Sequence, residues 1–181
     1  MRISLAFLAL LLAACGQPTQ HEKLMRVGDF QLVDHDGRVF HSTSLQGRPA
    51  LLFFGYTHCP DACPTTMSKV ARAYREAGSA ARDIPTLFVS VDPRDTPPVL
   101  KQYLGYFRAV PAKGLTGSKA QIDAVVRQFG ARYEIRDSGS AAGPVVDHTI
   151  RLFLLDRDGD VIRLFEPDAD AKDIAKAMKG A

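Results

Sequence analysis

The chain has little of what several protein classes require. Its formal net charge is only +3, and no basic stretch is interleaved with aromatic residues, a composition that argues against nucleic-acid binding. It has only three cysteines, which leaves room for at most one disulfide bond. The apolar run at residues 3–12 is too short to span a bilayer, which takes roughly 20 apolar residues. Hydrophobic residues still make up 46% of the chain, enough for the core of one globular domain.

The N-terminus has the pattern of a secretory signal. Arg2 precedes the apolar run, and small residues precede Cys15, the order that signal peptides follow. Leu12-Ala13-Ala14-Cys15 also resembles a bacterial lipobox, which implies that Cys15 is acylated and becomes the mature N-terminus. The alternative is an ordinary signal peptide that contains a cysteine. We predict a signal peptide at 1–14, a lipidated N-terminus and tether at 15–27, and one domain at 28–181, held by its lipid on the periplasmic side of a bacterial membrane.

The two remaining cysteines, Cys59 and Cys63, form a close pair. A disulfide across four residues closes a very short loop and removes little entropy from the unfolded chain, so the pair is better suited to chemistry than to stabilisation. An apolar strand precedes the pair, and Pro64 suits the first position of a helix. We therefore expect Cys63 near the helix cap, where unpaired N–H groups and the helix dipole favour thiolate over thiol. Cys59 lies about one helical turn earlier.

Strand and helix patterns alternate along the rest of the chain. The combination predicts an α/β protein with a mixed sheet flanked by helices on both sides. A dithiol at the first strand-to-helix turn narrows this to a thioredoxin-like three-layer fold with an N-terminal β-hairpin, whose site lies beyond the carboxyl ends of the parallel strands. The expected strands are 30–33, 38–40, 50–56, 85–91, 133–136, 149–155 and 161–165. The expected helices are 64–77, 97–107, 119–130 with Ser118 as its cap, and 168–179, and residues 137–144 are expected to be a loop.

The cysteine pair has three possible uses: a resting disulfide, a redox dithiol or a soft-metal site. Three residues separate the cysteines, not the two of C-x-x-C redox motifs. Thiolates favour Cu(I) and zinc, but two sulfurs are too few for a closed four-coordinate zinc site. His148, just before a predicted strand, is the candidate third ligand, which only the fold can bring close. Asp147 could orient its imidazole or be a solvated turn residue.

Three ordered blocks resemble the Sco/SenC family, the copper proteins required for cytochrome c oxidase assembly. These blocks are FGYTHCPDACP at 54–64, SVDPRDTP at 90–97 and DHT at 147–149. The resemblance implies a thioredoxin-like domain that binds one copper, as Cu(I) or Cu(II), through Cys59, Cys63 and His148. It also implies a metallochaperone that delivers copper to the dinuclear site of oxidase subunit II, or keeps the cysteines of that site reduced. Many relatives have a membrane helix where this chain has its lipobox.

Two other functions use the same cysteines. A thiol–disulfide oxidoreductase without a role in copper delivery would need Cys59 and Cys63 as its redox dithiol, but His148 would be expendable. A thiol peroxidase is the weaker alternative, because no separate resolving cysteine remains once Cys15 is lipidated. The expected partners are oxidase subunit II, other periplasmic copper chaperones or thiol reductases, and the membrane through the lipid anchor.

Overall fold

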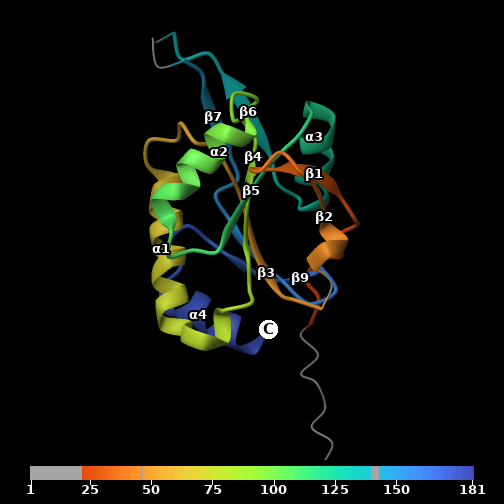
Figure 1. The fold of residues 1–181 in the computed structure, drawn as a ribbon, viewed down its shortest axis with the longest axis vertical. Coiled ribbons are helices and arrows are strands. Elements are labelled where there is room, and N and C mark those ends of the chain that lie inside the picture. The colour runs from red at the N-terminus through yellow and green to blue at the C-terminus, as the bar shows by residue number, and fades with distance from the viewer. Residues whose placement is uncertain (1–21, 46, 140–142) are drawn as a thin grey trace, which may run out of the picture.

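A computed structural model describes residues 22–45, 47–139 and 143–181 of the chain, and the predicted signal peptide and Cys15 lie outside these ranges. A central sheet has the strand order β2-β1-β5-β4-β3-β8-β9, with helices on both of its faces (Figure 1). This confirms the predicted three-layer α/β architecture. Its strands are β1 (Gln31–Asp34), β2 (Val39–His41), β3 (Ala50–Gly55), β4 (Thr86–Ser90), β5 (Ala112–Thr116), β8 (Leu152–Leu155) and β9 (Val161–Phe165).

Strand β3 is an inner strand of the sheet, between β4 and β8, and is buried along its whole length. It pairs in parallel with β4 and antiparallel with β8. Because side chains alternate along a strand, Phe53 packs edge-on against Phe88 with ring centroids 5.0 Å apart, whereas its neighbour Phe54 packs against Phe129 and Phe153. The sheet thus has an apolar core on each face, and the carboxyl end of β3 leads directly to the cysteines.

The helices divide between these two faces. Helix α1 (Ala62–Ala77) packs against α4 (Ala171–Gly180) on the face of Phe53, and α2 (Pro97–Leu104) lies on the same side, where Tyr103 contacts Phe88. Helix α3 (Lys119–Gln128) lies on the opposite side in Figure 1, next to β1. Ser118 caps α3 through a reciprocal capping box with Gln121, as its position before the helix predicts. No helix in the described part of the chain is long and apolar enough to cross a membrane.

One central strand was not predicted from the sequence. Strand β5 lies between β4 and β1, parallel to the first and antiparallel to the second. Its five residues include Lys113 and Gly114, which weaken a strand pattern. Gly114 is needed for packing, because a Cβ atom there would lie 2.9 Å from Cδ1 of Leu104 in α2.

The strand predicted at 149–155 is shorter and is preceded by another. Only Leu152–Leu155 joins the main sheet, whereas β7 (Val145–His148) pairs antiparallel with β6 (Tyr133–Arg136) in a separate two-stranded sheet. The predicted edge strand at 133–136 therefore exists, but it pairs with β7 and not with the central sheet. The amide of Thr149 donates to the carbonyl of Arg132, one residue beyond the paired strands, and β8 begins at Leu152.

Helix α1 also begins earlier than predicted. Its first residue is Ala62, so Cys63 is the second helical residue and Pro64 the third. Proline is tolerated here because the first N–H groups of a helix have no acceptor within it. Helix α4 begins at Ala171, three residues later than predicted, where the side chain of Asp170 accepts the amide of Lys172.

Candidate metal centre

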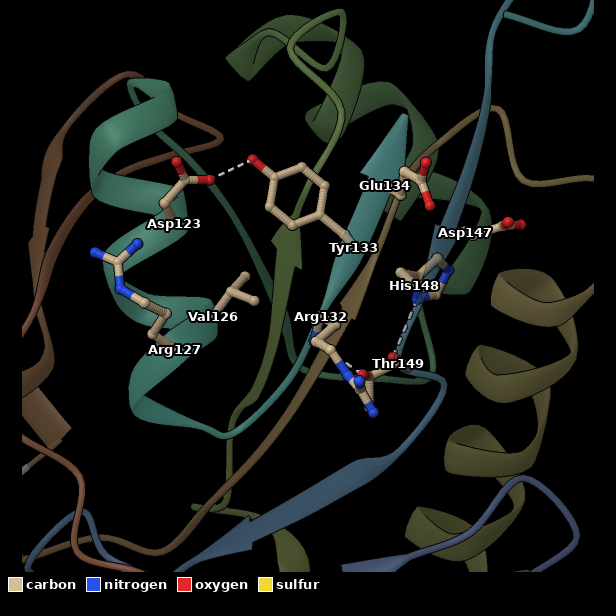
Figure 2. A pocket seen from close by; sticks show the side chains of 9 residues that line it. All are labelled: Asp123, Val126, Arg127, Arg132, Tyr133, Glu134, Asp147, His148 and Thr149. Carbon is tan, nitrogen blue, oxygen red and sulfur yellow. Dashed lines mark hydrogen bonds between the residues drawn. The ribbon is translucent and has the colours of Figure 1, made fainter. Parts of the chain in front are cut away.

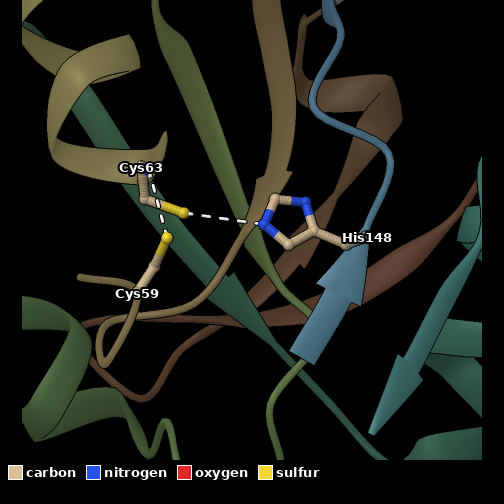
Figure 3. A group of neighbouring side chains, drawn as sticks. All are labelled: Cys59, Cys63 and His148. Atoms are coloured by element: carbon tan, nitrogen blue, oxygen red, sulfur yellow. Dashed lines mark hydrogen bonds between the residues drawn. The ribbon is translucent and has the colours of Figure 1, made fainter. Parts of the chain in front are cut away.

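Two sulfurs and one imidazole meet beyond the carboxyl end of β3. The backbone N–H of Cys63, in the first turn of α1, donates to Sγ of Cys59 over 3.3 Å, and Sγ of Cys63 lies 3.8 Å from Nε2 of His148 (Figure 3). One ligand atom from each of the three residues lies within 4.8 Å of the others. The fold therefore places His148 beside Cys59 and Cys63, although at least 85 positions of the chain separate it from either cysteine.

The separation of these atoms fits a shared metal ion. Bonds of roughly 2.3 Å to a thiolate and 2.1 Å to an imidazole, at angles between tetrahedral and trigonal, put sulfur and nitrogen about 3.6 to 3.8 Å apart. The distance between Sγ of Cys63 and Nε2 of His148 agrees with this range. Soft thiolates with an imidazole form a donor set that suits copper or zinc and excludes hard cations such as Mg²⁺ and Ca²⁺.

The environment of His148 keeps its imidazole neutral and oriented. Burial lowers its pKa, because desolvation disfavours the charged form. Its Nδ1 lies 3.1 Å from the carbonyl oxygen of Thr149, which can only accept, so Nδ1 carries the proton and the lone pair of Nε2 faces Cys63. The ring of Tyr56 meets the imidazole edge-on, with centroids 5.8 Å apart. These contacts prepare Nε2 as a ligand atom.

The sulfur of Cys63 is not the low-pKa thiolate that the sequence suggests. It is almost fully buried, and desolvation raises the pKa of its thiol far above the usual range. The cap-like position was expected to have the opposite effect. One of the N–H groups at this helix end, that of Cys63, points to Sγ of Cys59 and not to the sulfur of Cys63. A metal at this site must therefore displace the proton of Cys63, so that its binding is coupled to proton release.

The cysteine loop is anchored by a buried carboxylate. Asp95 accepts hydrogen bonds from the backbone amide of Thr57 over 2.8 Å, from its hydroxyl over 2.6 Å, and from the hydroxyl of Ser90 over 2.6 Å. Its side chain is fully buried, and His58 lies 3.7 Å away. The turn after β4 thus fixes the loop two residues before Cys59.

The same turn also holds the segment that carries the histidine. Arg94 binds the buried carboxylate of Asp92 with Nε and Nη2, and Nη2 also donates to the carbonyl of Pro144 over 3.0 Å. Gly143 has a φ of +82°, and a Cβ atom there would lie 2.7 Å from Nη1 of Arg94. The guanidinium therefore joins the turn after β4 to Pro144, the residue directly before β7. Pro144 lies four positions before His148.

A second group of possible ligands, His58, Asp92 and Asp95, lies close by. Both carboxylates are already engaged, Asp92 by the guanidinium of Arg94 and Asp95 by Thr57 and Ser90. This group is a support of the site and not a cation site.

An open depression of about 550 Å³ lies between α3 and the strands β6 and β7 and reaches His148 (Figure 2). The exposed Asp147 lines it and pairs with Arg136, so it does not orient the imidazole, whose Nδ1 contacts Thr149. The structure thus favours the solvated alternative for Asp147.

The sequence did not predict a role in the site for the supporting residues Asp92, Arg94 and Asp95, although they lie in one of the blocks that carry the family resemblance. The signal that could have found them is the pair of acidic residues next to an arginine at the end of a buried strand, where an unpaired charge would be costly. Gly55 was missed as well. A Cβ atom there would lie 2.9 Å from both Sγ of Cys63 and Cε2 of Phe88.

Comparison with known proteins identifies the family. The SCO1/SenC family model matches residues 18–181. A SCO2-like protein of Rickettsia felis is 37% identical over 169 residues, which cover 91% of this chain and 82% of that protein. The copper-bound structure of Bradyrhizobium japonicum ScoI is 36% identical with a TM-score of 0.76, over 84% of this chain and 97% of that one. A SCO1/SenC family lipoprotein from Bacillus anthracis is 25% identical with a TM-score of 0.76, over 87% and 96%. By the extent of these matches, the chain belongs to the SCO1/SenC family.

Proposed function

We propose that the protein binds one copper ion through Cys59, Cys63 and His148 and serves in the assembly of cytochrome c oxidase. The observation that carries this proposal is the meeting of two cysteine sulfurs with a neutral imidazole at the end of β3. The copper in the related Bradyrhizobium structure supports the choice of metal. Two thiolates and a neutral imidazole leave Cu(I) with a net charge of −1 and Cu(II) neutral, so that one donor set tolerates both oxidation states.

The finer role that we propose is delivery of copper to oxidase subunit II, or reduction of the cysteines of its copper site. Cys59 is half-buried whereas Cys63 is buried, so an incoming thiolate would meet Cys59 first. Stepwise exchange of ligands requires such an accessible sulfur. We also propose that acylated Cys15 holds the domain on the periplasmic side of a bacterial membrane, a proposal that the lipoprotein from Bacillus anthracis supports.

Copper titration of the reduced protein tests the ligand set. One equivalent should bind tightly, and Cys59→Ser or Cys63→Ser should abolish tight binding, because one thiolate and one imidazole hold the ion poorly. Tyr56, which contacts His148 but offers no soft donor, provides the matched control: Tyr56→Phe should keep the stoichiometry. Undiminished affinity in Cys59→Ser would contradict the proposal.

The alternative, a thiol–disulfide oxidoreductase without a copper role, is favoured by one contact. The N–H of Cys63, in the first turn of α1, donates to the sulfur of Cys59, the half-buried cysteine that an incoming disulfide would meet first. The two functions differ in their need for His148. If His148→Ala keeps full activity in the assembly of active oxidase in cells, the reductase is the correct function.

A further inference from the structure

A second surface begins one residue beyond the cysteine pair. The outer side of α1 and the turn η3 (Gly105–Phe107) enclose a depression of about 640 Å³ that starts at Pro64 and Thr65. We call it the arginine groove. Its further lining includes Ser68, Arg72 and Arg75 from α1, and Tyr106, Phe107 and Arg108 from η3 and the residue after it. The α1 residues recur at helical spacing, so they lie along one stripe of the helix.

The charge of this groove is of one sign. Arg72, Arg75 and Arg108 are exposed, and none of the residues that line the groove is acidic. In the ranges that the structure describes, none of the three guanidinium groups forms an ion pair. Only Arg108 is partly engaged, because its Nε donates to the carbonyl of Gly105 over 3.2 Å.

A purely structural role explains only part of this arrangement. Arg75 lies in the last turn of α1, where a cation favours the helix dipole. That reason does not extend to Arg72 in the middle of the helix or to Arg108 outside it. Three unpaired cations around one hollow repel one another, and an anionic occupant would remove this repulsion.

The groove also presents an aromatic side chain to solvent. Tyr106 is 77% exposed, the most exposed of the large hydrophobic residues in the described part of the chain. Its neighbour Phe107 is half-buried and packs on Tyr103, with ring centroids 5.3 Å apart, so the turn that presents Tyr106 is fixed to the core. Arginine and tyrosine are among the residues that are enriched at the binding hot spots of protein interfaces.

We propose that the arginine groove docks an acidic segment of a partner protein and so brings that partner to Cys59 and Cys63. The carboxylates of the segment would pair with Arg72, Arg75 and Arg108, and its apolar side chains would cover Tyr106. The role of docking in exchange at the cysteines rests on the proposed function, whereas recognition of an acidic segment does not. A protein segment suits the hollow between α1 and η3 better than a flat lipid surface does, because the charges line its sides.

Binding of a fluorescent glutamate-rich peptide to the full chain in nonionic detergent tests the recognition. Arg72→Glu with Arg108→Glu should weaken binding by about tenfold, since two favourable exposed pairs become repulsive. Arg157→Glu with Arg163→Glu makes the same charge change on exposed residues outside the groove and should leave the affinity within about twofold. Amide chemical shifts should move along α1 and η3. Equal weakening in both double variants, or shifts spread over other elements, would overturn the proposal.

Two further measurements separate the possible outcomes. Mixed micelles that contain phosphatidylglycerol test the lipid alternative. If the protein binds these micelles but does not bind the glutamate-rich peptide, the proposal is overturned. In the second measurement, the reduced protein reacts with an acidic or a neutral peptide disulfide. Cys59 forms a mixed disulfide with one sulfur of the peptide, and the other sulfur leaves as a thiolate. The acidic peptide should react about tenfold faster at low salt, and the groove double variant should abolish this ratio. A ratio that the variant leaves unchanged would refute docking next to the cysteines. Neither measurement involves copper, so a failure of the proposed function leaves both valid.

Discussion

Replacing Gly55 by alanine should disturb the cysteine site through one added methyl group. The new Cβ atom would lie 2.9 Å from Sγ of Cys63 and 2.9 Å from Cε2 of Phe88. The ring of Phe88 is fully buried and packs against Phe53 and Tyr103, so it yields little space. The sulfur must then move by about 0.5 to 1 Å to reach an ordinary contact distance.

This displacement has two measurable consequences. Overpacking of a buried site costs about 1–3 kcal/mol of unfolding free energy, which for a protein of this size lowers Tm by about 2–4 °C per kcal/mol. Moving one sulfur relative to His148 should also weaken copper binding by about 10- to 100-fold, the loss that follows when residues that orient metal ligands are mutated. Thermal unfolding followed by circular dichroism measures the first effect, and competition with a copper chelator measures the second.

Gly114→Ala is the matched control for this variant. On β5 of the same sheet, its Cβ atom would lie 2.9 Å from Cδ1 of Leu104 and 3.1 Å from Cβ of Leu100, neither of which belongs to the cysteine site. It should lose stability to a similar extent and keep its copper affinity. If both variants weaken copper binding equally, or if Gly55→Ala binds copper like the unmodified protein, the space at Gly55 does not position Cys63 and the argument is refuted.

Three other predictions concern His148, Tyr74 and Cys15. His148→Ala should weaken Cu(II) more than Cu(I), because two thiolates alone satisfy Cu(I); spectra of the Cu(II) form that keep every nitrogen ligand would contradict this. The hydroxyl of Tyr74 donates to the carbonyl of Ile84, and burial raises the pKa of Tyr74 to about 12. As pH rises, the unfolded chain therefore loses this proton before the folded protein does, and the stabilisation that is present below about pH 10 is lost as pH rises toward 12. The unfolding free energy from urea titrations should fall with pH in this range, and in Tyr74→Phe its slope against pH should correspond to about one proton less. Cys15→Ser should release the protein from membranes without changing copper binding, and fractionation that finds the unmodified protein entirely soluble would contradict the lipid anchor.

Local patterns in the sequence predict the core of the fold. Apolar β3 and β4, the N-terminal hairpin and the Ser118 cap follow from side-chain periodicity and capping chemistry, which act over a few residues. Strand β5 does not follow from such rules, because Lys113 and Gly114 are tolerated there only through pairing on both sides and contact with Leu104. Tertiary packing overrides strand propensity at this position.

The residues of the candidate site were predictable, but their environment was not. Residue type and order point to Cys59, Cys63 and His148, whereas the raised pKa of the Cys63 thiol depends on how deeply the fold buries its sulfur. The position of His148 likewise depends on β7 pairing with β6 away from the main sheet, a long-range choice that local sequence does not encode. Burial and pairing between distant segments are properties of the whole chain.

The turn after β4 couples the local unfolding of two segments, the cysteine loop and the residues that lead into β7. Asp95 holds the loop before Cys59, and Arg94 holds the residue before β7. Any fluctuation that opens this turn breaks both contacts at once, the one that fixes the cysteine loop and the one that fixes the residue before β7. Hydrogen exchange of the Thr57 amide and of the amides in β7 should therefore report one cooperative opening. We therefore expect release of a bound ion to follow this opening, so that a turn that contributes no ligand governs it.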